Sequence, residues 1–257
     1  MAEEKKEEIA ALVETAEEEV KEPVKHTVDL SHWTPKTDLG KKVKNGEITD
    51  IEQIIDEGKK IRETEIIDVL LPGMESDLLL VGQSKGKFGG GKRRIFRQTQ
   101  KKTKEGNKPH FAAIAVVGNK DGYVGIAAGK SKETVPAREK AYRNAKLNMI
   151  KIRRGCGSWQ CGCKQGHSIP FKVSGRCGSI RIQLMPAPKG TGLKAEKECQ
   201  KILRLAGITD IWARTTGTTT TKINVLYACF DALKKLMSTK IKPEYYEKIG
   251  IVEGSQK

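Results

Sequence analysis

A glycine-rich, strongly basic segment, residues 81–108, is the feature that most restricts the fold of this chain. It holds ten Lys and Arg residues, the run Gly89-Gly90-Gly91 and a single acid, Glu105. A segment with so little apolar content cannot bury enough surface to fold alone, so we expect a partner to order it. Glycine lets a backbone approach its neighbour closely, and cations attract anions. A phosphate backbone is the neighbour that satisfies both properties.

The charge of the 257-residue chain is uneven and favours a polyanionic partner. The formal net charge is +16, but residues 1–23 contain nine Glu and three Lys, a net charge of −6. The rest of the chain therefore carries +22. A body this basic repels itself until an anion neutralises it, which indicates nucleic acid rather than a small acidic metabolite. The Glu-rich start is expected to be disordered and to stay away from that partner.

Hydropathy and cysteine content indicate a protein of the cytoplasm. No apolar run approaches ~18–20 residues, which predicts no membrane span. The opening residues lack the apolar centre of a signal peptide. The six cysteines are therefore expected to be thiols or metal ligands rather than disulfides. A membrane surface is the weaker alternative partner, since no basic helix with a strong apolar face stands out.

The pattern of apolar residues and turns predicts an α+β fold with two small domains. In the first domain, the turn Gly118-Asn119-Lys120-Asp121-Gly122 joins strands at 111–117 and 123–128. A helix at 131–152 follows, with Ala137, Ala141 and Ala145 in one stripe that can lie close on a sheet. With the alternating segment at 94–101, this predicts a three-stranded antiparallel sheet covered by a helix.

The second domain is expected to be α/β, with two strand–helix segments. Strands are predicted at 169–173, 179–185 and 211–215, and helices at 193–206 and 223–236. In the front part, Thr49-Asp50-Ile51-Glu52 fits a capping box that would start a short helix. The predicted divisions are an acidic tail and extension (1–65), the first domain (66–154), a Cys/Gly-rich connector (155–168), the second domain (169–240) and a tail (241–257).

Several ordered motifs resemble one family. They are the basic loop, Val135-Pro136-Ala137, Gly175-Arg176-Cys177-Gly178-Ser179, Pro186-Ala187-Pro188-Lys189-Gly190-Thr191-Gly192 and Leu205-Ala206-Gly207-Ile208. Their wording and order, from about residue 66 to 236, resemble the universal small-subunit ribosomal protein family S-five. The front extension, His167-Ser168-Ile169-Pro170-Phe171 and the cysteine-rich wording near Trp159 resemble the archaeal members.

The resemblance implies a structural protein of the small ribosomal subunit with no enzymatic activity. It implies a first domain similar to double-stranded-RNA-binding modules, and partners that are small-subunit rRNA, messenger RNA at the entry channel, and ribosomal proteins S-four and S-three. It also implies an effect on decoding accuracy and a cytoplasmic, ribosome-bound location. A free double-stranded-RNA-binding regulator is the alternative. The sequence does not support an enzyme, since no carboxylate pair, nucleophile–base set or nucleotide-binding loop can be assembled from it.

The predicted RNA contacts are cations of the basic loop and connector, with one aromatic ring for stacking on a base. Arginine forks bind phosphate oxygens, lysines act as point charges, and little base readout is expected. These residues are Lys85, Lys87, Phe88, Lys92, Arg93, Arg94, Arg97, Lys101, Lys102, Lys104, Arg153, Arg154, His167 and Lys189.

The connector contains four soft ligands, Cys156, Cys161, Cys163 and His167, within twelve residues. Such a set could wrap one tetrahedral zinc ion. The alternative is a Gly-rich RNA-contacting loop with unligated thiols, because two ligands separated by one residue make an awkward chelate. The spacing leaves both readings open. Cys199 and Cys229 are expected to be core thiols.

Two further features have plain structural interpretations. The loop at 188–192 resembles a phosphate cradle before a helix, but a tight strand-to-helix turn is the preferred account. Trp159 and Trp212 are expected to be buried against protein rather than stacked on bases.

Overall fold

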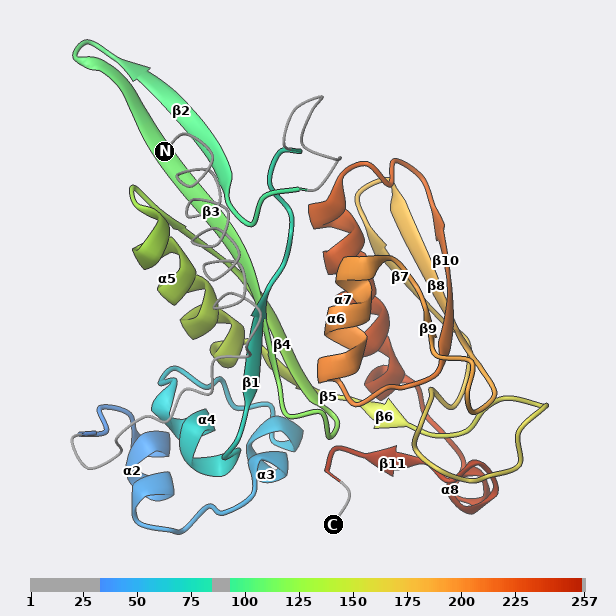
Figure 1. The fold of residues 1–257 in the computed structure, drawn as a ribbon. Coiled ribbons are helices and arrows are strands. Elements are labelled where there is room, and N and C mark those ends of the chain that lie inside the picture. Colours follow the sequence, from blue (N-terminus) through green and yellow to red (C-terminus); the bar gives the residue numbers. More distant parts are fainter. Residues whose placement is uncertain (1–32, 85–92, 256–257) are drawn as a thin grey trace, which may run out of the picture.

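The computed structural model describes residues 33–84 and 93–255. Two β-sheets stand in parallel layers with helices on and between them (Figure 1). Helix α5 covers one face of the first sheet, while α6 and α7 lie between the two sheets. No helix in these residues is long and apolar enough to cross a membrane.

The first sheet is larger than the sequence predicts. It contains β1 (Glu75–Leu78), β2 (Arg97–Thr103), β3 (Gly106–Gly118), β4 (Tyr123–Ser131) and β5 (Met149–Lys151). The order is β1-β3-β4-β5, and β2 pairs with the outer part of β3. The expected count of three strands is wrong because β1 and β5 are too short, at four and three residues, to show a periodic pattern.

Helix α5 (Thr134–Leu147) lies on this sheet through its small residues. Ala137, Ala141 and Ala145 are fully buried, as their spacing predicts. The strand below them carries Gly125 and Gly129, so helix and strand backbones approach closely. The helix ends at Leu147, short of the expected 152, because the following residues pair with β4 as β5.

The second domain has a four-stranded sheet with two helices on one face. Its elements are β7 (Val173–Cys177), β8 (Ile180–Pro186), β9 (Leu193–Lys194), α6 (Lys197–Leu205), β10 (Ile211–Thr216) and α7 (Lys222–Ser238). The strand order is β7-β8-β10-β9. The core thiols were predicted correctly, since Cys199 and Cys229 are fully buried on α6 and α7.

Two predicted elements of this domain are wrong in detail. The segment at 169–173 was expected to be a strand, but the strand begins at Val173. The helix expected from 193 begins only at Lys197, since Leu193 and Lys194 pair with β10. The side chain of Glu196 caps this helix by accepting from the backbone N–H groups of Glu198 and Cys199. The 188–192 loop therefore does not open a helix, and a carboxylate already fills the helix N-terminus.

The front extension folds as three short helices, α2 (Asp38–Lys44), α3 (Ile51–Asp56) and α4 (Glu65–Leu70). A small core of Val43, Ile54 and Ile66 joins them. The helix predicted behind Thr49 is present as α3, but the predicted capping box is absent and Asp50 makes no side-chain capping bond. Glu52 is engaged elsewhere, because it accepts a hydrogen bond from the Tyr123 hydroxyl at 3.0 Å.

The segments 155–168 and 241–255 fold against each other. Beyond the second domain, the chain forms α8 (Glu244–Ile249) and β11 (Val252–Glu253). Strand β11 pairs with β6 (Arg153–Arg154), and the Cys156 N–H donates to the Ile249 carbonyl at 3.0 Å. The segment expected as a tail thus packs against the Cys/Gly-rich segment, which we call the connector lobe (155–168).

Candidate RNA interface and metal centre

The outer half of β2 and β3 forms a two-stranded ribbon that projects from the body of the molecule (Figure 1). Residues 97–102 and 106–109 are all exposed. An isolated pair of strands without a packed face is marginally stable in water. The ribbon is therefore a surface that a partner would support.

Three of its cations, Arg97, Lys101 and Lys108, lie on one side, and Lys102 lies on the other. Residues directly opposite on paired strands share a face, and alternate residues along a strand share it too. Lys101 lies opposite Lys108, and His110 lies opposite Thr99. Arg97, Lys101, Lys108 and His110 therefore occupy one face, which we call the ribbon face. Like charges that stand opposite each other repel, so this arrangement favours an anion between them.

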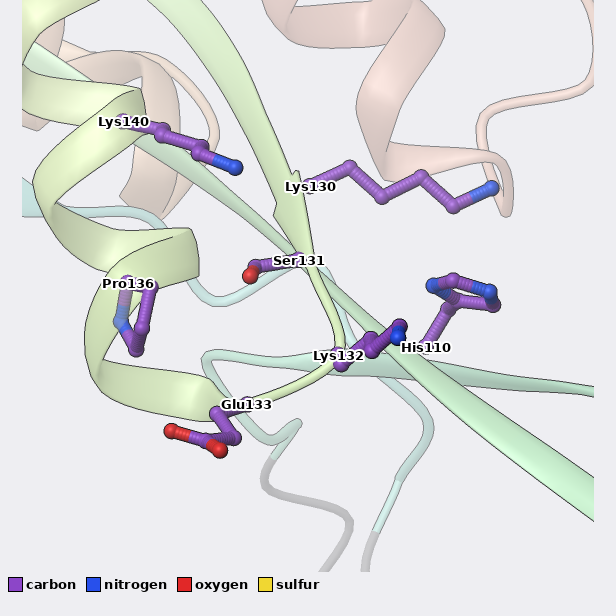
Figure 2. Close-up of a pocket in the computed structure, with 7 residues that line it drawn as sticks. All are labelled: His110, Lys130, Ser131, Lys132, Glu133, Pro136 and Lys140. Atoms are coloured by element: carbon purple, nitrogen blue, oxygen red, sulfur yellow. The ribbon is translucent and has the colours of Figure 1, made fainter.

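The ribbon face continues onto β4 and ends at an open pocket. Lys130 lies opposite Ala112, the residue that pairs with Arg97. The pocket has a volume of about 550 Å³ and is lined by His110, Lys130, Ser131, Lys132, Glu133, Pro136 and Lys140. Figure 2 shows Pro136 and Lys140 on α5, and Lys130 and Ser131 at the end of β4. We call it the basic pocket. Sequence reasoning missed it, although the start of a helix beside clustered lysines is a readable signal.

The predicted contacts of the basic loop fall into two groups. Lys85, Lys87, Phe88 and Lys92 lie outside the described residues. Arg93, Arg94, Arg97, Lys101, Lys102 and Lys104 are described, and all except the half-buried Arg93 are exposed. The Arg93 guanidinium donates to the Thr220 carbonyl at 3.0 Å, which ties the base of the loop to the second domain.

Arg153 and Arg154 make contacts within the protein. The Arg153 side chain is 11% exposed and pairs with Glu253 at 2.6 Å. The Arg154 side chain is 7% exposed and pairs with Asp121. Its guanidinium also donates to the Gly254 carbonyl at 3.0 Å. Both guanidinium groups are thus engaged within the protein, and their contact with RNA stays a prediction from the sequence.

The connector lobe brings its four soft ligands together. One ligand atom from each of Cys156, Cys161, Cys163 and His167 lies within 4.8 Å of every other. The Cys161 sulfur is 3.8 Å from Nε2 of His167. Cys156 and His167 are buried, and the other two are half-buried. The fold therefore brings together four ligand atoms whose spacing in the sequence fitted both a zinc site and a loop with unligated thiols.

Local hydrogen bonds prepare these thiols differently. Backbone N–H groups, that of Lys189 first and that of Cys163 second, lower the pKa of Cys161 to about 6. Burial, followed by contact with the other two thiols, raises the pKa of Cys156 to about 11. A thiolate is the form that binds metal, so Cys161 is ready as a ligand at neutral pH.

Asp210 orients the histidine from outside the cluster. Its Oδ2 lies 2.9 Å from Nδ1 of His167, and its Oδ1 accepts from the Gly192 N–H at 2.8 Å. An N–H at Nδ1 leaves the Nε2 lone pair facing Cys161. Sequence reasoning missed Asp210 because it lies 43 residues beyond His167 along the chain.

The two tryptophans expected to be buried are on the surface. Trp159 is 90% exposed in the connector lobe, and Trp212 is 36% exposed on β10. Trp212 alternates with the buried Ile211, so it points away from the helices. Its face of the second sheet also carries Arg176, Arg181 and Arg214, which pairing registers place on the same side.

Comparison with known sequences gives the family. The family described as "Ribosomal protein S5, N-terminal domain" matches residues 95–153, and "Ribosomal protein S5, C-terminal domain" matches residues 175–244. A protein of Nanoarchaeum equitans named "Small ribosomal subunit protein uS5" is 50% identical over 228 residues, which cover 89% of this chain and 98% of that protein. The chain belongs to the ribosomal protein S5 family.

Other members of the S5 family are similar over nearly the same span. The Methanocaldococcus jannaschii protein is 46% identical over 88% of this chain and 97% of its own length. The Methanothermobacter thermautotrophicus protein is 44% identical over 87% and 96%. The family resemblance read from the motifs, including its archaeal wording, is confirmed, as is the two-domain α+β architecture.

Proposed function

We propose that this S5-family chain is a structural component of the small ribosomal subunit that binds rRNA through the ribbon face and the basic pocket. The observation that supports this proposal is the ribbon, because Arg97, Lys101 and Lys108 share one face of it and it has no protein core of its own. A polyanion would neutralise the facing lysines and hold the strands in place. The family supports a ribosomal role and offers no support for the alternative of a free regulator.

The contacts proposed are mainly to phosphates. Arg94, Arg97, Lys101, Lys102, Lys104 and Lys189 are exposed cations that can reach a sugar-phosphate chain. Such contacts position a protein on RNA without reading its sequence. Lys85, Lys87, Phe88 and Lys92, which lie outside the described residues, are further proposed RNA contacts, with Phe88 stacking on an unpaired base.

The finer parts of the role follow from the family resemblance. We propose that the chain lines the messenger-RNA entry channel beside ribosomal proteins S-three and S-four, influences decoding accuracy and works in the cytoplasm without enzymatic activity. Stoichiometric recovery with small subunits after a high-salt wash is the expected outcome. Loss of the chain from washed subunits would favour the free regulator.

The same proposal covers a cofactor, since the tetrad of Cys156, Cys161, Cys163 and His167 has ligands suited to zinc. Three sulfurs and one imidazole nitrogen converge there. This centre lies in the connector lobe, separate from the ribbon face.

The first experiment replaces Arg97 and Lys101 together with Ala and measures affinity for small-subunit rRNA against salt concentration. We expect weaker binding, because two phosphate contacts are lost. The slope of log K against log salt should become shallower by about one unit per lost contact. Filter binding of the full chain over a series of salt concentrations gives this slope.

The matched control lies on the opposite face of the same strand. Replacing Gln98 and Gln100 with Ala removes two exposed polar side chains from β2 without changing charge. We expect this variant to keep the parent slope. Equal slopes for both variants and the parent would exclude the ribbon face as the RNA contact.

A further inference from the structure

The connector lobe contains a cluster that RNA binding does not explain. We infer that Cys156, Cys161, Cys163 and His167 form a closed structural zinc centre, and that this centre holds the 188–192 loop in position. The zinc itself follows from the ligands alone. The consequence for RNA rests on the proposed function, because Lys189 is a proposed contact.

The geometry needs little adjustment to accept the ion. In a tetrahedral zinc site with Zn–S of about 2.3 Å and Zn–N of about 2.0 Å, neighbouring ligand atoms are about 3.5–3.8 Å apart. The Cys161 sulfur and His167 Nε2 are already 3.8 Å apart, and the full set lies within 4.8 Å. A contraction of less than about 1.5 Å would close the tetrahedron. Sulfur-rich tetrahedral sites favour zinc over calcium or magnesium.

The close spacing of Cys161 and Cys163 is accommodated by the backbone between and after them. A Cβ built on Gly162 would meet nothing within 4 Å, so the turn is open at this point. Lys164, directly after Cys163, adopts a φ of 51°, in the left-handed region used by tight turns. The ligand atoms of Cys161 and Cys163 lie within 4.8 Å of each other and of the other two ligand atoms, so the two side chains face the same centre. These features answer the objection that the spacing raised.

A carboxylate fixes the histidine as an Nε2 ligand. The buried Asp210 accepts from Nδ1 of His167 at 2.9 Å. It is held in turn by the Thr209 hydroxyl at 3.0 Å and the Gly192 N–H at 2.8 Å. Zinc-binding histidines usually donate their second ring N–H to such a partner. Asp210 is therefore a positioning residue.

The same outer contacts reach both ends of the 188–192 loop. The Gly192 N–H donates to Oδ1 of Asp210 at 2.8 Å, and Asp210 in turn holds His167. The Lys189 ammonium also bonds Oε1 of Gln165 in the connector lobe at 3.1 Å. A metal that fixes His167 would thus fix, through Asp210, the loop that carries Lys189.

The first arm of the test measures metal. The full chain, purified under reducing conditions, should contain one equivalent of zinc, and cobalt substitution should give thiolate charge-transfer and tetrahedral d–d bands. Cys161→Ser should lose these bands, whereas Cys177→Ser, a half-buried cysteine of β7 outside the tetrad, should keep them. Substoichiometric zinc, unchanged bands in Cys161→Ser or a disulfide within the tetrad would overturn the centre.

A second variant keeps the test decisive if Cys161→Ser does not fold. Asp210→Asn retains the shape of the side chain but has only one acceptor oxygen. Its NH2 group cannot accept, so the side chain cannot use two oxygens to accept from Nδ1 of His167 and from the Gly192 N–H. We expect zinc affinity, measured by chelator competition, to fall about 10- to 100-fold, as for other partners of metal-bound histidines. An unchanged affinity would exclude the positioning role of Asp210.

The second arm measures the loop without RNA. Amide hydrogen exchange at Lys189 and Gly192 should be slower in the zinc-loaded chain than in the chain from which a chelator has removed zinc. Equal rates would overturn the proposal that the zinc centre holds the 188–192 loop. With RNA present, removing zinc and replacing Lys189 with Ala should weaken binding to a similar extent and not additively. If zinc slows amide exchange but does not change RNA affinity, the zinc centre does hold the 188–192 loop, and the proposed RNA contact of Lys189 is wrong.

Discussion

Two glycines lie under helices where any side chain would meet backbone atoms. A Cβ at Gly129 of β4 would overlap the Ala137 carbonyl and the Ala141 nitrogen of α5. A Cβ at Gly175 of β7 would overlap the backbone of α7 at Ala228 in the same way. Neither glycine has a positive φ. Each is required by close approach, so both domains seat a helix directly on a strand.

We expect Gly175→Ala to destabilise the protein by about 3 kcal/mol, the upper part of the range for overpacked cores. The reason is that backbone atoms of α7, unlike a flexible side chain, cannot move aside. Chemical denaturation followed by circular dichroism measures the change. Ser174→Ala, at the exposed neighbouring position of β7, is the control and should stay within about 0.5 kcal/mol of the parent. Equal stability of the two variants would contradict the close approach.

For single residues, the sequence predicted burial correctly where spacing along one helix decides it. The alanines of α5 and the thiols of α6 and α7 are buried as expected because helical period alone places them. Trp212 was misplaced because its burial depends on which face of a strand meets the helices. Asp210 was missed because its partnership with His167 depends on the folded connector lobe. Side chains that meet across long separations leave no periodic signal.

The pairing of β6 with β11 makes the late segment part of the body. Glu253 accepts from Nε of Arg153 and from the Tyr246 hydroxyl, both at 2.6 Å. Burial alone would raise the pKa of Glu253, but these donors outweigh it and lower the pKa below its ordinary 4.5. The ionised carboxylate is therefore the form that stabilises this pair of strands.

The sign of that shift predicts a pH dependence. The contribution of Glu253 should be complete above about pH 4.5 and should be lost as the pH falls through the lower pKa of the folded protein. Glu253→Gln should thus be less stable than the parent at about pH 7, and the difference should shrink at about pH 3. Urea unfolding midpoints of both proteins at each pH provide the comparison. A difference that does not change with pH would show that the charge is unimportant.

Long elements were predictable and short ones were not. The hairpin of β3 and β4 and the helices α5 and α7 follow from period and turn chemistry, although their ends differ by several residues. Strands β6, β9 and β11 have two residues each. Pairs of two residues are created by the tertiary contacts around them, so these strands could not be predicted from sequence. The connector lobe follows β6 directly along the chain. Its four ligands could be named, but their convergence could not.

The two domains share one hydrophobic core and are joined by backbone hydrogen bonds. One continuous core joins Val116 and Ile126 of the first sheet to Ile202 of α6. The hairpin turn also docks on the end of α6, since the N–H groups of Lys120 and Gly122 donate to the carbonyls of Leu205 and Ala206 at 2.9 and 3.2 Å. The domains are therefore expected to unfold together.

We expect one cooperative transition for the parent chain, with tryptophan fluorescence and circular dichroism giving the same midpoint. Gly118→Ala should separate the two signals, because a Cβ there would lie 2.5 Å from the Leu205 carbonyl oxygen and push the domains apart. Lys104→Ala, at the exposed end of the ribbon, should leave a single transition. Two transitions in the parent chain would show that the domains are independent.

The ribbon also has a consequence for how fast the protein meets its partner. The seven residues of β2 reach about 23 Å at 3.3 Å per residue, which exceeds the screening length of about 8 Å in physiological salt. The distal lysines are thus beyond the influence of acids on the main body. An incoming polyanion would therefore bind the ribbon first. The rest of the protein surface would then bind a polyanion that is already held nearby.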